Sequence, residues 1–254
     1  MNPPKNYLID MDGVLVNGYT VIAGADQFIA RLQSRGAKFL VLTNNSRYTP
    51  RDLSHNLTQI GLDIPPESIF TSALATAAFI HKQKPDGTAF AIGESGLTSA
   101  LHDQGYILTE HNPDYVVLGE SDTLNFDVLT KAIRLVKNGS RFIATNPDVS
   151  GPSERGIVPG CGAMAALIEK ASGVNALYIE KPNPLMMRSA INYLGVHSEN
   201  TVMVGDRMDT DIIAGVQTGM DTILVLSGVT RLDEVAKYPF VPTSICGSVA
   251  EIEV

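Results

Sequence analysis

The sequence contains no tryptophan and only two cysteines, Cys161 and Cys246, among its 254 residues. Two cysteines form one disulfide at most, which excludes a disulfide framework and fits a reducing cytosol. The five histidines stand at positions 55, 81, 102, 111 and 197, and no two of them have the spacing of paired zinc ligands. The sequence therefore predicts a cytoplasmic protein without a zinc site.

Long apolar segments are also absent. The longest unbroken apolar run covers residues 163–168, far short of the roughly 20 residues that a membrane-spanning helix needs. The first 13 residues, MNPPKNYLIDMDG, contain one lysine and no apolar stretch of signal-peptide length. We therefore expect no transmembrane helix, no cleaved secretion leader and no membrane partner.

Basic residues are fewer than acidic ones. The chain has 19 Lys and Arg against 27 Asp and Glu, a formal net charge of −8 at pH 7. Because this excess repels a phosphate backbone, the composition disfavours a nucleic-acid-binding protein. A small anionic substrate would need a metal ion or a local positive charge in order to bind.

The chain does contain short apolar runs that alternate with helical patterns, which is typical of βαβ units around a mainly parallel sheet. One helix is predicted over 25–35, with Gly36 as its stop, and a second begins after Thr49, with Pro50 as its first residue. The sequence therefore predicts the α/β class. The predicted strands are 7–9, 39–42, 89–92, 115–118, 142–144, 176–179, 201–204 and 222–226.

Two carboxylates follow the first predicted strand, in the segment YLIDMDGVL. In extended backbone, residues two positions apart point to the same side, so Asp10 and Asp12 approach one centre. Two neighbouring carboxylates repel each other unless a cation lies between them. Mg²⁺ is a hard ion that prefers oxygen ligands, and we therefore expect it here.

Polar residues also follow three other predicted strands. Thr43, with Asn44 and Asn45, offers a hydroxyl and turn amides to an anion, and Lys181 adds a positive charge after YIE. Asp206 and Asp211 come later, after another strand, in VMVGDRMDTDI.

Each of these motifs by itself also fits a capping turn or a solvated strand end. Their joint occurrence is more specific, because the carboxyl ends of parallel strands meet at one edge of a sheet. Three or four carboxylates with one lysine and one threonine at that edge favour a site for a metal ion and a transferring phosphoryl group.

The four segments resemble the four motifs of the haloacid dehalogenase (HAD) superfamily of phosphatases, in the order DMDGV, Thr43, Lys181 and GDRMDTD. The segments TNNS, NPDYVVLGE, FIATNPD and LVLSGV are similar to the NagD-type branch, subfamily IIA. The resemblance implies a Rossmann-like, doubly wound parallel-sheet core with an inserted α/β cap of the C2 type.

Motif spacing predicts where the cap is inserted. Only 30 residues lie between Asp12 and Thr43, whereas 137 lie between Thr43 and Lys181. A bare core needs only one or two βα units in the longer gap, at roughly 30 residues each. We therefore expect a core formed by 1–79 and 179–254 and an α/β cap at 80–178.

The resemblance also implies a role for each motif. Asp10 would attack phosphorus to give an aspartyl-phosphate, and Asp12 would act as general acid and base. Thr43 and Lys181 would bind the phosphoryl oxygens. Cys161, which precedes a helical pattern, is either a thiol of low pKa or a small packing residue.

The implied cofactor is Mg²⁺, held by the carboxylates of Asp10 and Asp206 and the backbone carbonyl of Asp12. Asp211 would orient Lys181 or a metal-bound water through a hydrogen bond, without binding the metal itself. Asn44 and the amides after it would line the phosphate cradle. Asn146 and Asp148 are further candidates for substrate binding, although a turn around residue 147 explains them equally well.

We therefore expect a Mg²⁺-dependent phosphomonoester hydrolase whose partner is a small-molecule phosphate monoester, with a nucleoside monophosphate such as UMP or GMP as the main expectation. The alternatives are sugar-phosphate, phosphoglycolate or p-nitrophenyl phosphate hydrolysis, phosphoryl transfer to an alcohol, and non-catalytic binding of a phosphate ester. Whether the chain forms a homo-oligomer is left open.

Overall fold

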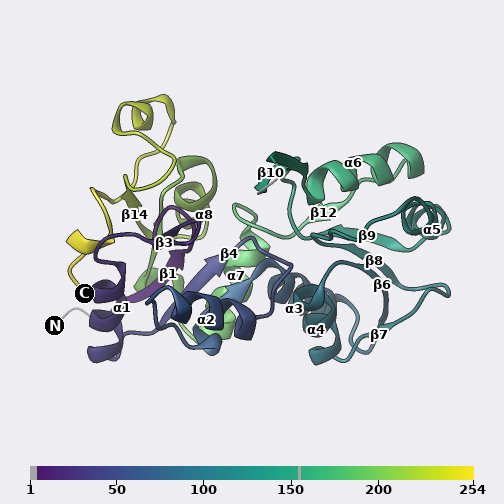
Figure 1. Cartoon of the computed structure of the whole chain (residues 1–254), viewed down its shortest axis with the longest axis horizontal. Coiled ribbons are helices and arrows are strands. Elements are labelled where there is room, and N and C mark those ends of the chain that lie inside the picture. Colours follow the sequence, from purple (N-terminus) through teal and green to yellow (C-terminus); the bar gives the residue numbers. More distant parts are fainter. Residues whose placement is uncertain (1–4, 154–155) are drawn as a thin grey trace. The chain divides into compact units, whose positions relative to one another are not determined.

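The computed structural model describes residues 5–153 and 156–254, and these form two compact units (Figure 1). The first unit contains residues 1–43, 50–70 and 181–254, and the second contains 44–49 and 71–180. Residues 1–4, which belong to the segment in which we expect no leader, lie outside the described residues. Within the described ranges, no helix has the length and apolarity that crossing a membrane requires.

The first unit is built on a six-stranded sheet with the order β15-β14-β13-β1-β4-β5. Central β1 pairs in parallel with β13 and β4, and its Ile9 lies opposite Val204 of β13. Leu8 and Ile9 point to opposite faces, and both are fully buried, so both faces are covered. The strands are β1 (Asn6–Asp10), β4 (Phe39–Thr43), β5 (Ile69–Thr71), β13 (Thr201–Gly205), β14 (Asp221–Val225) and β15 (Ser244–Cys246).

Helices cover this sheet because each has an apolar face. Phe28 of α1 and Leu53 of α2 pack in one core with Ile9, and α7 contacts β4 and buries Met186 and Met187. The helices are α1 (Ala25–Ser34), α2 (Pro50–Gln59), α7 (Pro184–Leu194) and α8 (Ile213–Gln217), with a π-helical turn at Met208–Ile212 before α8 and a small hairpin, β2 (Val16–Asn17) and β3 (Thr20–Val21), after β1.

The second unit has its own five-stranded parallel sheet, with the order β12-β9-β8-β6-β7. Figure 1 shows α5 and α6 on one side of this sheet and α3 and α4 on the other. Its strands are β6 (Thr88–Ile92), β7 (Ile107–Leu108), β8 (Tyr115–Leu118), β9 (Arg141–Ala144) and β12 (Leu177–Tyr178), with a separate hairpin, β10 (Ser150–Ser153) and β11 (Gly156–Pro159); its helices are α3 (Ser72–Gln83), α4 (Ser95–Asp103), α5 (Phe126–Lys137) and α6 (Cys161–Ser172).

These two parallel α/β sheets confirm the predicted fold class. Two edge strands of the first unit, β5 and β15, were missed because three residues carry too little alternation to be recognised. The compact units also divide at different positions from the predicted ranges 1–79, 80–178 and 179–254. Helix α3 belongs to the second unit, where the carbonyl of Ile80 accepts a 2.8 Å hydrogen bond from the Tyr106 hydroxyl.

Candidate active site

Three strands of the first unit end in polar residues at one edge of the sheet. Asp10 is the last residue of β1, Thr43 is the last of β4, and Asp206 directly follows β13. Because β1 lies between β13 and β4 and all three are parallel, these residues come from adjacent strand ends. This edge is where open α/β sheets bind ligands.

Lys181 connects two of the predicted carboxylates. Its ammonium donates a hydrogen bond of 2.6 Å to Oδ1 of Asp10 and another of 2.8 Å to Oδ1 of Asp211. Lys181 and Asp211 are almost completely buried. The second oxygen of Asp211 accepts from the backbone N–H of Arg207 at 3.2 Å, so both oxygens of Asp211 are used within the protein.

The site holds more negative charge than its one ammonium offsets. Burial and the nearby charge of Asp211 raise the pKa of Asp10 to about 8, and Lys181 only partly opposes this. Burial by itself would lower the pKa of Lys181, but the charges of Asp10 and Asp211 and the hydrogen bonds to them raise it above its usual range. Lys181 therefore stays cationic, and an additional cation would favour the ionised form of Asp10.

Asp206 provides an oxygen that is suited to a cation. Its Oδ2 accepts a 2.7 Å hydrogen bond from the N–H of Val229, while its buried Oδ1 has no hydrogen-bond partner among the described residues. Burial raises the pKa of Asp206, because a desolvated carboxylate is costly. Oxygens of Asp10, Asp206 and Asp211 lie within 4.8 Å of one another. This buried group of three aspartates fits a divalent metal site.

Two glycines allow the chain to approach Asp206 closely. Gly13 has φ +79°, and a Cβ added there or at Gly228 would overlap the carboxylate of Asp206. The hydroxyl of Ser227 donates to the carbonyl of Gly13 at 2.7 Å, which joins the turn after β1 to the loop after β14. Ser227, Gly228 and Val229 are not among the predicted site residues. Val229 acts through its main-chain N–H, Gly228 through the lack of a side chain, and Ser227 through a hydroxyl contact with a distant carbonyl, and none of these leaves a motif in the sequence.

Asp12 differs from the buried aspartates. Its side chain is exposed, and its backbone forms a bridge with Val16. Partial desolvation raises the pKa of Asp12, and the charge of Lys181 opposes that shift. Asp12 is not a member of the three-aspartate group, and the contribution predicted for it is a backbone carbonyl and not its carboxylate.

The other predicted residues fall on both sides of the boundary between the units. Thr43 is buried at the end of β4 in the first unit, whereas Asn44 and Asn45 belong to the second. Asn146 and Asp148 also lie in the second unit, where Oδ1 of Asn146 accepts a 3.2 Å hydrogen bond from the N–H of Asp148. This contact forms a turn around residue 147, which is the alternative to substrate binding that was given for Asn146 and Asp148.

Cys161 is a buried packing residue at the start of α6. Its thiol lies 3.5 Å from the carbonyl oxygen of Leu118, and burial raises its pKa. A raised pKa favours the unreactive thiol over the thiolate. Of the two roles considered for Cys161, the structure therefore supports packing and not a reactive thiol.

Comparison with protein families gives two matches. The sequence model of one family, described as haloacid dehalogenase-like hydrolase, matches residues 7–107. The sequence model of a second family, described as HAD-hyrolase-like, matches residues 178–252. Together they include the segments that carry all four motifs.

Individual relatives match nearly the whole chain. The dihydroxyacetone phosphatase of Corynebacterium glutamicum is 55% identical over 247 residues, which cover 97% of this chain and 90% of the relative. The acid sugar phosphatase of Staphylococcus aureus is 41% identical over the full length of both chains. The solved structure of NagD from Escherichia coli K-12 is 44% identical and matches 98% of each chain with a TM-score of 0.94.

Proposed function

The chain belongs to the haloacid dehalogenase-like hydrolases and is a phosphatase of the NagD-like subfamily IIA, and from this premise we propose that it hydrolyses small sugar phosphates through an aspartyl-phosphate at Asp10. The observation that carries the proposal is the buried contact of Lys181 with both Asp10 and Asp211, beside an oxygen of Asp206 that has no hydrogen-bond partner in the described part of the chain. This arrangement supplies a nucleophile, a fixed positive charge and a place for a cation.

Each residue has a distinct task in the proposed reaction. A carboxylate oxygen of Asp10 attacks phosphorus, and the bond from phosphorus to the substrate oxygen breaks. Asp12 protonates the leaving alcohol and then removes a proton from the water that hydrolyses the aspartyl-phosphate, a role that suits its exposed carboxyl and raised pKa. Thr43 and Lys181 donate hydrogen bonds to the phosphoryl oxygens, where negative charge is spread.

Asp211 keeps Lys181 in place, because both of its oxygens are already used by Lys181 and the Arg207 N–H. The divalent cation in this proposal is Mg²⁺, held by the carboxylates of Asp10 and Asp206 and the backbone carbonyl of Asp12. When bound, the ion supplies positive charge that lowers the repulsion between the phosphoryl group and the carboxylates.

The relatives favour the alternative substrate class over the nucleoside monophosphate that was our main expectation. Dihydroxyacetone phosphatase and acid sugar phosphatase are named for small sugar phosphates, and the first of them is 55% identical, against 44% for the ribonucleotide monophosphatase NagD. We therefore place triose and other small sugar phosphates first and UMP and GMP second. Hydrolysis of phosphoglycolate stays an alternative, and a cytoplasmic location stays a prediction.

A phosphate-release screen tests the proposal. The panel contains dihydroxyacetone phosphate, hexose phosphates, phosphoglycolate, UMP, GMP and p-nitrophenyl phosphate, each with Mg²⁺ and with excess chelator. We expect fastest release from a sugar phosphate, none with chelator, and at least a ~10³-fold loss in Asp10→Asn, because the nucleophile is removed. Phosphate release by Asp10→Asn at the wild-type rate would overturn the mechanism, and faster release from UMP would overturn the substrate class.

A further inference from the structure

Residues 44–49, which we call the 44–49 segment, directly follow Thr43 and yet pack as part of the second unit. The chain passes from the first unit to the second between Thr43 and Asn44, so a single peptide bond separates the proposed phosphate-binding residue from this segment. Leu42, which precedes Thr43, is the register partner of Asp10. The position of Thr43 relative to Asp10 therefore depends on β4 before it and on the 44–49 segment after it.

The strongest attachment of the 44–49 segment is a reciprocal pair of hydrogen bonds between Ser46 and Glu120. The N–H of Ser46 donates to Oε2 of Glu120 at 3.0 Å, and the N–H of Glu120 donates to the Ser46 hydroxyl oxygen at 2.9 Å. The hydroxyl of Thr145, which directly follows β9, also donates to the hydroxyl of Ser46 at 3.1 Å. Ser46 and Thr145 are fully buried.

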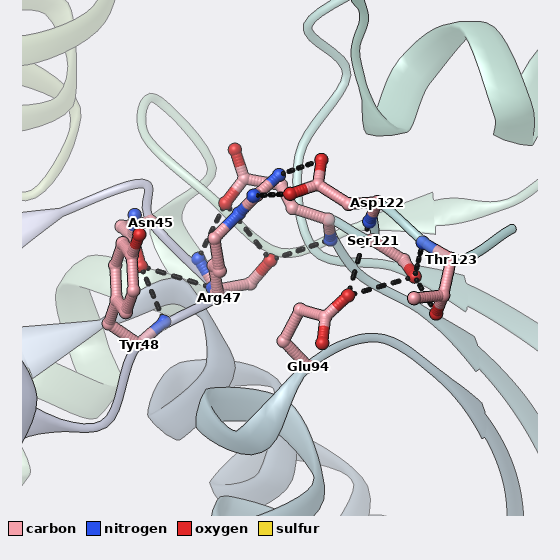
Figure 2. Close-up of polar contacts among 9 residues, drawn as sticks. Asn45, Arg47, Tyr48, Glu94, Ser121, Asp122 and Thr123 are labelled. Carbon is pink, nitrogen blue, oxygen red and sulfur yellow. Dashed lines mark hydrogen bonds and ion pairs between the residues drawn. The ribbon is translucent and has the colours of Figure 1, made fainter.

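Neighbouring residues of the segment are attached as well. The carbonyl of Asn44 accepts from the Ser72 hydroxyl at 2.7 Å. Figure 2 shows the guanidinium of Arg47 paired with the carboxylate of Asp122, and the Asn45 side chain accepting backbone N–H bonds within the turn. The segment is therefore held by helix α3 and by the loop after β8.

Two glycines allow the main chain of the second unit to pack closely against the segment. A Cβ added at Gly96 would lie 2.6 Å from the carbonyl oxygens of Ser46 and Tyr48, and one added at Gly119 would lie 3.0 Å from the hydroxyl oxygen of Ser46. The N–H of Gly96 also donates to the carbonyl of Arg47 at 2.9 Å. Because the main chain approaches so closely at these two glycines, the 44–49 segment is tightly packed and is not a loose loop.

The contacts differ in strength. The pair formed by Arg47 and Asp122 is largely solvent-exposed, since 71% of the Asp122 side chain is accessible, and exposed ion pairs contribute little. The hydrogen bond from Ser46 to Glu120 involves a carboxylate and a buried donor, and such charge-assisted bonds are stronger. The position of the 44–49 segment therefore depends mainly on Ser46 and Glu120.

We propose that Ser46 and Glu120 are positioning residues for the phosphatase reaction, which hold the 44–49 segment so that Thr43 meets the phosphoryl group. This inference rests on the proposed function, because it assumes that Thr43 binds phosphoryl oxygens. Displacement of a reacting group by about 1 Å costs up to ~10²-fold in rate. The alternative is that β4 by itself positions Thr43, in which case Ser46 and Glu120 only stabilise the fold.

The second unit contains a matched control. Thr88 and Asp114 make the same reciprocal pair, with the N–H of Thr88 donating to Asp114 at 2.9 Å and the N–H of Asp114 donating to the Thr88 hydroxyl oxygen at 3.0 Å. Thr88 is the first residue of β6, and Asp114 directly precedes β8, whose carboxyl end leads to the loop containing Glu120. Loss of either pair removes similar hydrogen bonds from the second unit, but only the pair of Ser46 and Glu120 holds the 44–49 segment.

The experiment compares Ser46→Ala and Glu120→Ala with Thr88→Ala and Asp114→Ala, and adds Glu120→Gln. Each Mg²⁺-loaded variant is assayed for kcat and KM with p-nitrophenyl phosphate, for inhibition by inorganic phosphate, and for its melting temperature. We expect kcat/KM to fall ~10-fold and inhibition by phosphate to weaken ~10-fold in Ser46→Ala and Glu120→Ala. Glu120→Gln should keep most of the wild-type kcat/KM and most of the inhibition by phosphate, because its side-chain carbonyl still accepts the Ser46 N–H.

The controls should lose a similar number of degrees in melting temperature and keep wild-type kinetics and phosphate inhibition. Wild-type kinetics in folded Ser46→Ala or Glu120→Ala would overturn the positioning role, as would equal kinetic losses in the controls. If one of the two alanine variants does not fold, the other decides the question, because each removes one half of the reciprocal pair. If neither folds, Glu120→Asp, which shortens the side chain and keeps its charge, takes their place with Asp114→Glu as its control. Absence of phosphate release by the wild type would instead overturn the proposed function, so the two failures are distinguishable.

Discussion

Lys181 donates a 2.6 Å hydrogen bond to Oδ1 of Asp10, although 171 positions separate the two residues in the chain. A buried lysine and a buried aspartate stabilise each other. Without its partner, either charge would have lost its hydration and gained no compensating interaction. In the proposed reaction the same ammonium also binds the phosphoryl group. The pair therefore contributes to both stability and catalysis, and the two contributions can be measured separately.

Replacement of Lys181 by methionine should reduce stability and abolish phosphate release. The variant leaves Asp10 and Asp211 buried without their cation, which costs about 3–5 kcal/mol in metal-free buffer. Urea unfolding in the presence of chelator measures this loss. Lys38→Met, at an exposed position, is the control and should stay within about 0.5 kcal/mol of the wild type. Equal stability of the two variants would contradict the buried pairing.

Replacement of Asp206 by asparagine should raise the Mg²⁺ concentration needed for activity by at least ~10-fold, because a carboxylate is a stronger ligand than an amide. The Oδ2 contact with the Val229 N–H can be kept by the amide oxygen, so the fold should survive. Titration of phosphate release and of melting temperature with Mg²⁺ measures the change. Asp209→Asn, in the π-helical turn three positions later and with an exposed side chain, should respond to Mg²⁺ like the wild type.

Replacement of Gly13 by alanine should disturb the metal site, whereas the same change at Gly36 should not. Both glycines have positive φ, +79° and +63°, so each substitution strains the backbone by about 1 kcal/mol. Only at Gly13 does the new methyl group overlap the carboxylate of Asp206. Gly36→Ala should keep full activity, while Gly13→Ala should lose more stability and its response to Mg²⁺. A normal Mg²⁺ response in Gly13→Ala would show that Asp206 can move away at little cost.

Protonation of Asp114 should make the stability of the second unit fall as the pH is lowered in the acid range. Its hydrogen bond with Lys84 lowers the pKa of Asp114, so the folded state binds the proton less readily than the unfolded state. This contribution, about 1 kcal/mol, is complete above the unfolded pKa of about 4 and is lost as pH falls through the lower folded value. The gap in melting temperature between wild type and Asp114→Asn should therefore be largest at pH 7 and close below pH 3. A gap that widens in acid would refute this linkage.

Sequence patterns predict much of the architecture because local chemistry determines it. β1 and β4 are short runs of buried residues, each ending in a polar side chain, and both were placed to within one or two residues. Helix α2 begins at Pro50, as its capping residues predict. Predictions of this kind depend only on neighbours in the chain.

The division into units depends on contacts between distant residues. Ser46 lies only three positions after Thr43, and no local signal assigns it to the second unit; its bonds to Glu120 and Thr145 do so. Helix α3 likewise belongs to the second unit because the hydroxyl of the distant Tyr106 donates a hydrogen bond to its Ile80 carbonyl. These contacts join residues whose separation along the chain ranges from 26 to 99 positions, so their formation could not be inferred from composition or periodicity.

The sequence by itself determined the α/β class, the four motif positions and the phosphatase family, because strand periodicity and motif order are local properties. Only the tertiary structure decided which charges are buried together. It placed Lys181 between Asp10 and Asp211, left one oxygen of Asp206 without a partner within residues 5–153 and 156–254, and attached the 44–49 segment to the second unit. Desolvation and pairing are properties of side chains that folding brings together, and they set the pKa values and the place for a cation.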